Sequence, residues 1–430
     1  MSSAAPIAAT AVILAAGQGT RMKSRHPKAV HRILGKPMVA FPAEICRALG
    51  IARVIVVVPP GGAVQSALGD GFEYVEQAQP LGSADALRAA VAVLGETSGP
   101  VVILAACQPA ISPESIRELL ELHRVGGVIA AVGSGGKLPR VPGVLPCVIC
   151  AETLKTTCDE LPSQGASEVT EVSDLLRRLD GHGHPVQFIA RHEMEHWVQV
   201  GDRRELAHVT AYIRGLILRE HMLNGVTIED PANTYIEPGV IIGQDTVIRP
   251  QTFLSSGTVI GEECEIGPFV RISNCRLGDR ISIQSAVLAD SEVGDDTNIG
   301  PFAQLRPGCK VGRKVKIGNF VELKNTTAED RASMGHFAYL GDAFIGEKSN
   351  IGAGTITCNY DGKKKHRTHI GRNAFVGTHA TLVAPVTVGD GAFIAAGSVV
   401  TEEVPADALA IGRGRQVNKP DWAKQRRERE

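Results

Sequence analysis

Hydrophobic runs divide the chain into two regions with different periodicity. Up to about residue 200, short Val, Ile and Ala runs at residues 11–16, 54–58, 101–106 and 186–190 alternate with helix-like stretches. This alternation predicts a mostly parallel sheet with crossover helices. Residues 202–224 then carry apolar side chains at helical spacing and end at an Asn-Gly pair, which predicts one long connecting helix.

Beyond residue 225 the recurring unit is an aliphatic residue followed by glycine, with separations that are repeatedly six or a multiple of six. The pairs begin at Ile242, Ile260, Ile266, Val293, Ile299, Val311 and Ile317, and resume at Ile345, Ile351, Ile370, Val376 and Val388. This period predicts a β-helix in which each hexapeptide forms one flat side of a triangular coil. The phase breaks at residues 322–340 and 355–370, where we expect inserted loops of the kind that often lie on a binding face.

Composition fits a thin aliphatic core, since 47 of the 430 residues are Gly and only 4% are aromatic. Charge is balanced, with 45 Lys and Arg against 46 Asp and Glu, so no overall field favours nucleic acid or an anionic membrane. The nine scattered cysteines argue against a disulfide scaffold and for a reducing cytoplasm. The apolar start at residues 7–16 lacks a preceding basic residue, which favours a buried strand over a signal peptide, and no apolar run reaches the length of about 18 residues that spans a bilayer.

A glycine-rich segment follows the first expected strand. Residues 14–22 read Leu-Ala-Ala-Gly-Gln-Gly-Thr-Arg-Met, and Pro27-Lys28 follows closely. Such a turn lets backbone N–H groups approach a phosphate, which Arg21 and Lys28 could neutralise. The segment matches neither the dinucleotide fingerprint nor a P-loop, so a tight strand-to-helix connection is the alternative.

This segment resembles the nucleotide loop of sugar nucleotidyltransferases, and a hexapeptide β-helix behind it resembles the GlmU family. That family couples an N-terminal N-acetylglucosamine-1-phosphate uridylyltransferase to a C-terminal glucosamine-1-phosphate N-acetyltransferase. The resemblance implies a Rossmann-like α/β nucleotidyltransferase domain at residues 1–201, a linker helix at 202–225, a left-handed parallel β-helix at 226–412 and a tail at 413–430. It is densest at residues 305–308, 318–324, 335–342 and 350–362, where Asn-Ile-Gly-Ala-Gly-Thr-Ile-Thr-Cys-Asn-Tyr-Asp-Gly is highly specific.

The resemblance implies roles for individual C-terminal residues. His336 would be the general base that takes a proton from the glucosamine amine, with Glu322 as a supporting partner, because imidazole titrates near neutrality. The other implied contacts are Arg306, Lys324 and Lys365 to the sugar phosphate; Tyr339 and Asn350 to the sugar; Asn359 to the sugar and the acetyl-CoA groove; and Ala353, Tyr360, Thr378, Ala396 and Arg413 to acetyl-CoA. Thr378 replaces the family's more usual Ser but keeps the hydroxyl. The alternatives are a structural histidine at 336 and a solvated loop at 363–365.

The same resemblance implies a homotrimer with active sites between subunits, in which Arg413 and the tail through Trp422 reach a neighbour. Acetyl-CoA would be the co-substrate, and the partners would be small molecules rather than nucleic acid or membrane. Which amino sugar is the acceptor stays open, because acceptor choice depends on loop shape.

The N-terminal half departs from the family at its metal ligands. Residues 104–110 read Leu-Ala-Ala-Cys-Gln-Pro-Ala, so Cys107 stands where the family has the magnesium-binding Asp, and Gly201 stands where it has Asn. A thiol is a poor ligand for magnesium. Both ligands are missing unless Asp202 substitutes.

The stretch 111–170 is also too short and lacks recognisable sugar-binding elements. The residual nucleotide contacts would be Leu14, Ala15, Gly17, Arg21, Lys28, Gln77, Gly82 and Ser83. We therefore expect a shortened, degenerate uridylyltransferase domain, with magnesium needed only if uridylyl transfer is retained.

Two further motifs have ordinary explanations. Residues 192–196 satisfy the zinc peptidase pattern His-Glu-x-x-His, but they follow an apparent strand and lack the extended pattern that would add a third His. Cys147 and Cys150, with Cys158 nearby, lack a second ligand pair and are expected to be buried thiols.

The leading hypothesis is an acetyltransferase in UDP-N-acetylglucosamine and cell-envelope synthesis. A fully bifunctional enzyme and a non-catalytic nucleotide-binding or structural paralogue are the alternatives.

Overall fold

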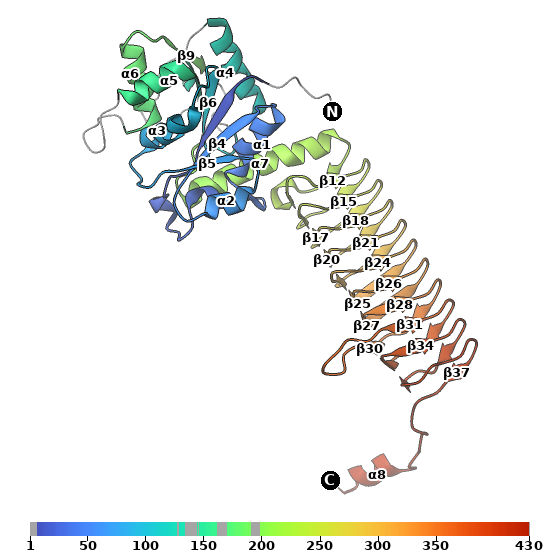
Figure 1. Cartoon of the computed structure of the whole chain (residues 1–430). Helices are drawn as coiled ribbons and strands as arrows, with labels where there is room; N and C mark the ends of the chain where they lie inside the picture. Colours follow the sequence, from blue (N-terminus) through green and yellow to red (C-terminus); the bar gives the residue numbers. More distant parts are fainter. Residues whose placement is uncertain are drawn as a thin grey trace. The chain divides into compact units, whose positions relative to one another are not determined.

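The computed structural model describes residues 7–126, 129–133, 144, 146–160, 170–190 and 198–429 (Figure 1). The chain divides into two compact units, Met1–Leu216 and Ile217–Glu430. The pattern His192 to His196 lies outside the described residues. Within them, no helix has the length and apolar character that crossing a membrane requires.

A seven-stranded sheet in the order β5-β4-β1-β6-β8-β7-β9 forms the centre of the first unit. Only β8 runs antiparallel to its neighbours, so the prediction of a mostly parallel sheet is confirmed. The described residues of β1, β4 and β6 are almost entirely buried, as expected where helices cover both faces. The bounds are β1 (Thr10–Leu14), β4 (Arg53–Val58), β5 (Glu73–Glu76), β6 (Pro100–Ala105), β7 (Ile129–Gly133), β8 (Cys147–Cys150) and β9 (Val186–Ala190), with a small hairpin of β2 (Arg32–Ile33) and β3 (Lys36–Pro37).

Helices complete this unit. Helix α3 packs on α5 and α6, and α1 packs on α4. The helices are α1 (Ala40–Ala48), α2 (Ala63–Leu68), α3 (Ser83–Leu94), α4 (Pro113–Gly126), α5 (Ala151–Asp159) and α6 (Val172–Gly181), with 3-10 turns at Thr20–Met22 and Lys28–Val30. Helix α7 (Arg203–Leu223) begins in the first unit and ends in the second, which confirms the single helix expected at 202–224.

The second unit is a left-handed β-helix of short parallel strands. One 19-stranded sheet wraps two sides of the coil. Its members are β10 (Thr227–Ile228), β11 (Tyr235–Ile236), β13 (Val247–Ile248), β14 (Phe253–Leu254), β16 (Glu265–Ile266), β17 (Arg271–Ser273), β19 (Ser282–Ile283), β20 (Val287–Ala289), β22 (Asn298–Ile299), β23 (Gln304–Leu305), β25 (Lys316–Lys324), β27 (Ser333–Gly341), β29 (Asn350–Ile351), β30 (Ile356–Cys358), β32 (Phe375–Val376), β33 (Thr381–Val383), β35 (Phe393–Ile394), β36 (Val399–Val400) and β37 (Leu409–Ala410).

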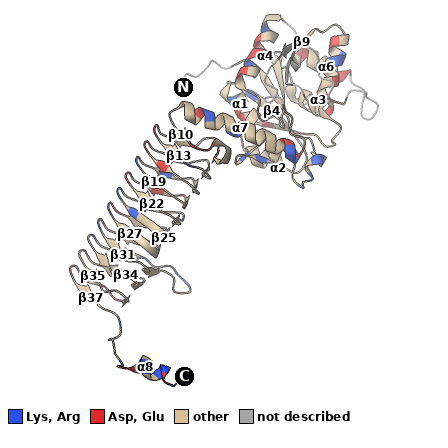
Figure 2. Cartoon of the chain, turned by 180° about the vertical axis from the view of Figure 1, so that it is seen from behind, with Lys and Arg blue, Asp and Glu red and all other residues tan. Residues whose placement is uncertain are grey.

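A nine-stranded sheet forms the third side. Its members are β12 (Ile241–Ile242), β15 (Val259–Ile260), β18 (Arg276–Leu277), β21 (Glu292–Val293), β24 (Lys310–Val311), β26 (Thr327–Ala328), β28 (Ala343–Ile345), β31 (Thr368–Ile370) and β34 (Val386–Val388). The chain ends in the short, exposed helix α8 (Trp422–Arg427), which carries Lys and Arg in its last turn (Figure 2).

Stacked aliphatic side chains fill the coil. Leu254, Ile272, Leu288, Leu305 and Leu323 follow one another on successive coils and are almost completely buried. Burial of such a side chain contributes roughly 1.5–3 kcal/mol. The expected aliphatic core is confirmed.

Aromatic side chains line one outer corner instead. Phe302, Phe320 and Phe337 each adopt a left-handed backbone conformation at the corner and are 60%, 56% and 64% exposed. The rings of Phe302 and Phe320 stack with centroids 5.4 Å apart. This row of rings, the Phe corner, lies on the outer surface of the coil.

The prediction of an inserted loop at residues 322–340 is wrong. Strands β25 and β27 pair continuously from Lys316 beside Ser333 to Lys324 beside Gly341, so the coil runs through residues 322–340 without an inserted loop. This coil is one residue shorter than an 18-residue turn, and the omitted corner residue shifts the sequence phase while the strands stay in register.

The second interruption is confirmed. Ile356 pairs with Thr381, and the extra residues between β30 and β31 leave the coil as a hairpin, closed by the antiparallel bridge of Tyr360 and Lys365. We call residues 359–367 the insertion hairpin.

Candidate active sites

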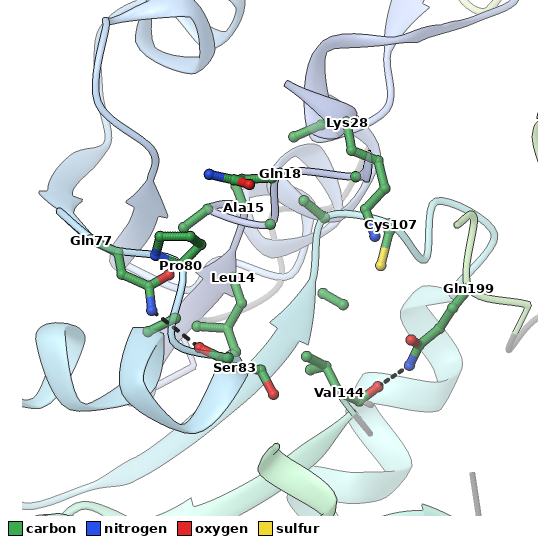
Figure 3. Close-up of a pocket in the computed structure, with 18 of the residues that line it drawn as sticks. Leu14, Ala15, Gln18, Lys28, Gln77, Pro80, Ser83, Cys107, Val144 and Gln199 are labelled. Atoms are coloured by element: carbon green, nitrogen blue, oxygen red, sulfur yellow. Dashed lines mark hydrogen bonds between the residues drawn. The ribbon is translucent and has the colours of Figure 1, made fainter. Parts of the chain in front are cut away.

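A cavity of about 410 Å³ lies at the carboxyl ends of β1 and β6. The strand order reverses at β1, with β4 and β5 on one side and β6 on the other, and ligands of open α/β sheets bind at such a switch point. All eight residues expected to contact a nucleotide line this cavity, namely Leu14, Ala15, Gly17, Arg21, Lys28, Gln77, Gly82 and Ser83. Figure 3 labels Leu14, Ala15, Lys28, Gln77 and Ser83 among them. Their binding role remains a prediction.

The glycine loop is shaped by close contact with Lys28. Gly19 has φ +64°, and a Cβ there would lie 2.6 Å from the Lys28 Cβ. Only glycine combines this conformation and this approach without strain. The Lys28 side chain crosses the loop and runs toward Cys107 (Figure 3).

The opposite wall is held by the first turns of α3 and α6. Gln77 Nε2 donates to the Gly82 carbonyl at 3.1 Å and to Asp85 Oδ2 at 2.8 Å. Ser83 Oγ donates to the Glu171 carboxylate and accepts from the Val172 N–H. Sequence analysis missed Glu171, whose position becomes visible only when α3 and α6 pack together.

The metal-ligand positions do not supply hard oxygen ligands. Cys107 is buried in the cavity wall. At Gly201, a Cβ would lie only 2.2 Å from Arg21 Nη2, so the Arg21 guanidinium occupies the space where a side chain at 201 would begin. A cation at this place is incompatible with a magnesium ligand there. The residues present therefore do not fit the ion.

Asp202 does not replace the missing ligands. Its carboxylate accepts from the Arg204 and Glu205 backbone N–H groups at 2.8 and 3.0 Å and from Arg204 Nη2 at 2.8 Å. These bonds, led by the one to the Arg204 side chain, lower the pKa of Asp202 to about 2. Asp202 is the N-terminal cap of α7. Among the described residues, no group of three His, Cys, Asp or Glu side chains could hold a metal ion.

The cysteines that the sequence groups together are Cys147 and Cys150 in β8 and Cys158 in α5. Cys147 is fully buried, and burial raises the pKa of its thiol. Cys158 is buried as well, and its pKa is raised to about 12. The expectation of buried thiols therefore holds for Cys147 and Cys158, whereas Cys150 is only partly buried.

A second candidate site lies along the β-helix, where His336 begins a column with one residue on each coil. Asn319 and His336 are register partners, and His336 Nδ1 donates to Asn319 Oδ1. This bond leaves Nε2 of the neutral ring as the proton acceptor, on a side chain that is exposed. Glu322, expected to support His336, instead accepts from Arg306 Nη1 at 3.0 Å. Asn319 therefore makes the contact that sequence analysis assigned to Glu322.

Three of the residues expected to bind acetyl-CoA, namely Ala353, Thr378 and Ala396, continue this column. The Gly354 N–H bonds to the Phe337 carbonyl and the His379 N–H to the Ala353 carbonyl, which stacks Ala353 and Thr378 below His336. The Gly397 N–H bonds to the Thr378 carbonyl, which adds Ala396, and Arg413 Nη1 donates to the Ala396 carbonyl at 2.8 Å. With strands about 4.8 Å apart, the column from His336 to Ala396 is about 14 Å long.

A cationic cluster forms on the flat side that follows the Phe corner. Lys365 lies close enough to Lys324 to lower the pKa of Lys324, and desolvation acts in the same direction. Two ammonium groups this close favour an anion between or beside them.

Polar groups beside the lysines complete this cluster. The Tyr339 hydroxyl and the Asn359 amide lie 2.5 and 2.7 Å from where a Cβ on Gly341 would stand. Asp342 accepts from the Asn325 and Asn359 amides. Burial opposes ionisation of Asp342, but these bonds prevail and lower its pKa. Sequence analysis missed Asp342, although it lies within the quoted 335–342 segment.

The His336 column and the cationic cluster occupy different flat sides of the coil. His336 and Asn350 precede the Phe corner, whereas Arg306, Lys324 and Tyr339 follow it. Tyr360 and Lys365 extend outward on the insertion hairpin. The two sets of candidate residues in one chain thus lie on either side of the Phe corner.

Comparison with known proteins agrees with both halves of the molecule. Residues 11–211 match the MobA-like NTP transferase domain, and residues 290–325 and 367–402 match the bacterial transferase hexapeptide family. "Bifunctional protein GlmU" of Geobacillus sp. strain WCH70 is 39% identical over 96% of this chain and 97% of its own length. The chain belongs to the GlmU family.

Further GlmU proteins extend the match. Those of Geobacillus thermodenitrificans and Bacillus velezensis are each 40% identical over 96% of this chain and cover 97% and 98% of their own lengths. The chain therefore corresponds to nearly the whole of a GlmU protein, with both the nucleotidyltransferase fold and the hexapeptide coil.

Proposed function

We propose that the chain transfers an acetyl group from acetyl-CoA to the amine of glucosamine 1-phosphate, giving N-acetylglucosamine 1-phosphate for UDP-N-acetylglucosamine synthesis. The amine nitrogen attacks the thioester carbonyl, His336 Nε2 accepts the amine proton, and coenzyme A leaves as its thiolate. The observation that carries the proposal is the column from His336 through Ala353 and Thr378 to Ala396, one residue on each coil.

The arrangement of this column suits an extended thioester. An acetyl group beside His336 would leave the rest of coenzyme A to follow the coil axis toward Arg413, whose guanidinium is exposed and suits a phosphate. Backbone N–H groups on the coil edge can stabilise the oxyanion that forms on the thioester carbonyl.

The sugar phosphate would bind at the cationic cluster. Arg306, Lys324 and Lys365 supply positive charge, while Tyr339, Asn359 and, from the other flat side, Asn350 supply hydrogen bonds to sugar hydroxyls. Glu322 partly neutralises Arg306 and keeps its guanidinium directed along the coil.

A homotrimer would bring together the two sets of candidate residues, the His336 column of one copy and the cationic cluster of another. Because His336 and the cationic cluster lie on either side of the Phe corner, the base of one copy can meet the sugar phosphate held by another. Exposed rings at Phe302, Phe320 and Phe337 supply apolar surface for such contacts.

We further propose that the N-terminal unit no longer performs uridylyl transfer. The supporting observations are the buried thiol at Cys107 and the Arg21 guanidinium against Gly201, because the reaction needs a divalent ion to neutralise charge on the phosphates. The alternative is a fully bifunctional enzyme, and the intact cavity with its eight expected lining residues favours retained nucleotide binding.

One preparation assayed for both half-reactions tests these proposals. We expect thiol release from acetyl-CoA that depends on glucosamine 1-phosphate, and no pyrophosphate release from UTP, N-acetylglucosamine 1-phosphate and Mg²⁺. Absence of thiol release would overturn the acetyltransferase proposal. Magnesium-dependent pyrophosphate release would establish the bifunctional alternative.

A further inference from the structure

We propose that Arg21 takes the place of a divalent cation in the N-terminal cavity, so that the cavity binds a nucleoside phosphate without a metal ion. The inference rests on the proposed loss of uridylyl transfer and goes beyond it. It assigns a metal-independent binding site to a cavity whose ligand set does not fit magnesium.

The first observation is where the Arg21 guanidinium lies. Its Nη2 atom is 2.2 Å and its Cζ atom 2.8 Å from the position of a Cβ on Gly201. Any side chain at 201 would collide with it, so glycine is what permits this placement. The missing side chain and the guanidinium are therefore complementary.

The second observation is what holds the turn at Gly201, against which the Arg21 guanidinium lies. Glu205 Oε2 accepts from the backbone N–H groups of Gly201 and Asp202 at 2.6 and 3.1 Å, and it lies 3.0 Å from the same Cβ position. The carboxylate fixes the turn before α7 and lies on the same side of Gly201 as the guanidinium.

The third observation is the balance of charge in the cavity wall. Arg21 and Lys28 are its cations, and Glu171 is the carboxylate among the described lining residues, where it accepts from Ser83. Two cations on the glycine loop therefore face the cavity. A planar guanidinium binds phosphate oxygens through paired hydrogen bonds, and an ammonium group adds a point charge.

The ligand class follows from this chemistry. A glycine loop with two cations suits a chain of phosphates, while the wall formed by Gln77, Gly82 and Ser83 suits the remainder of a nucleotide. A metal complex is not required, because the protein itself supplies the positive charge. Binding without the ion would leave the phosphates unreactive.

Isothermal titration of the full chain with UTP tests the proposal, in parallel buffers that contain Mg²⁺ or EDTA. We expect dissociation constants within about threefold of one another in the two buffers, and much weaker binding of uridine than of UTP. Binding of UTP only with Mg²⁺, or no binding in either buffer, would overturn the proposal.

Variants locate the effect. Arg21→Ala should weaken UTP binding about tenfold to a hundredfold in both buffers, as expected for a lost charge-assisted contact. Gly201→Ala should also weaken it, because the new Cβ displaces the guanidinium. Gly215→Ala, on the same stretch of chain with no atom within 4 Å of its new Cβ, is the matched control and should bind as the parent does. Unchanged affinity in Arg21→Ala would contradict the proposal.

The result of the UTP-binding test can be distinguished from the result of the tests of the proposed function. Thermal melting and thiol release report whether each variant folds and whether the β-helix remains active. Pyrophosphate release would remove the premise that uridylyl transfer is lost. Magnesium-dependent UTP binding without pyrophosphate release would remove only the role given to Arg21.

Discussion

The N-terminal cavity and the β-helix site are incomplete in opposite respects. The cavity gathers every expected nucleotide contact within one unit of one chain, but the positions for hard metal ligands hold Cys107 and Gly201. The residues proposed for acetyl transfer all lie on the β-helix, but on two different flat sides of the coil. On these proposals, the first site is well formed in space but lacks its metal chemistry, and the second has its catalytic groups but needs a second copy to bring them together.

The strongest test of this contrast is His336→Ala. Loss of the proton acceptor should lower acetyl transfer about 10²-fold to 10⁴-fold, measured as thiol release, and leave UTP affinity unchanged. His369→Ala is the control, since His369 lies on the third side of the coil, stacked on Phe344 at 4.6 Å. Comparable loss in both variants would contradict a specific role for His336.

The cationic cluster is tested by Lys365→Met. Loss of one ammonium group should raise the KM for glucosamine 1-phosphate roughly tenfold or more, with a smaller effect on the KM for acetyl-CoA. It should also raise the pKa of Lys324, since contact with Lys365 is the main cause of the lowered value. Lys363→Met alters the same hairpin outside this contact and should leave both constants near those of the parent.

The missing metal chemistry is tested by the double variant Cys107→Asp, Gly201→Asn. The new side chain at 201 displaces Arg21, and two oxygen ligands then face the cavity. We expect UTP to bind about tenfold more tightly with Mg²⁺ than with EDTA, by titration calorimetry. Equal binding in the two buffers would show that other features of the cavity exclude the ion.

The positioning of His336 is tested by Asn319→Ala and Asn319→Asp. The first should lower kcat about tenfold with little change in either KM, because the ring loses its orienting acceptor. The second places a carboxylate beside the imidazole, which favours the protonated ring and should move the acidic limb of the pH–rate profile to higher pH. A purely structural role would leave that limb unmoved.

The smallest effect concerns the α7 cap. The folded-state pKa of Asp202 is about 2, below the ordinary value of 3.8, so its contribution to stability is present above about pH 4 and lost as the pH falls toward 2. Asp202→Asn should therefore flatten the pH dependence of the melting temperature in this interval. Acetyl transfer at neutral pH should stay unchanged.

Periodicity predicted much of the fold because each hexapeptide repeats one local task. An aliphatic residue enters the core and a small residue follows, so Ile299 and Ile317 identify successive coils without knowledge of the rest. The number of residues in each coil could not be predicted in this way. The coil between Lys316 and Ser333 omits one corner residue, which shifts the sequence phase while leaving the strands paired. A broken phase alone could not distinguish an omission from an insertion.

Contacts between side chains were harder to predict from the sequence than the places of the candidate residues. The glycine loop and Gln77 indicated the cavity because glycine turns and strand ends are local features. The approach of Arg21 to Gly201 joins segments 180 residues apart, and nothing in either segment encodes it. Likewise, Asn319 lies beside His336 only because the coil between them has 17 residues. The same register places Glu322 beside Tyr339 and not beside His336.

The column below His336 advances by one residue for each coil, so the proposed acetyl-CoA groove would have a length set by a whole number of turns. Removal of one complete coil between Ala353 and Ala396 would bring Arg413 about 4.8 Å nearer to His336 and leave the thioester arm too long for the proposed groove. Removal of a complete coil before Asn298 would leave every member of the column in place. Insertion or deletion of a whole coil should therefore be harmful between Ala353 and Ala396 and tolerated before Asn298, although the repeats look alike.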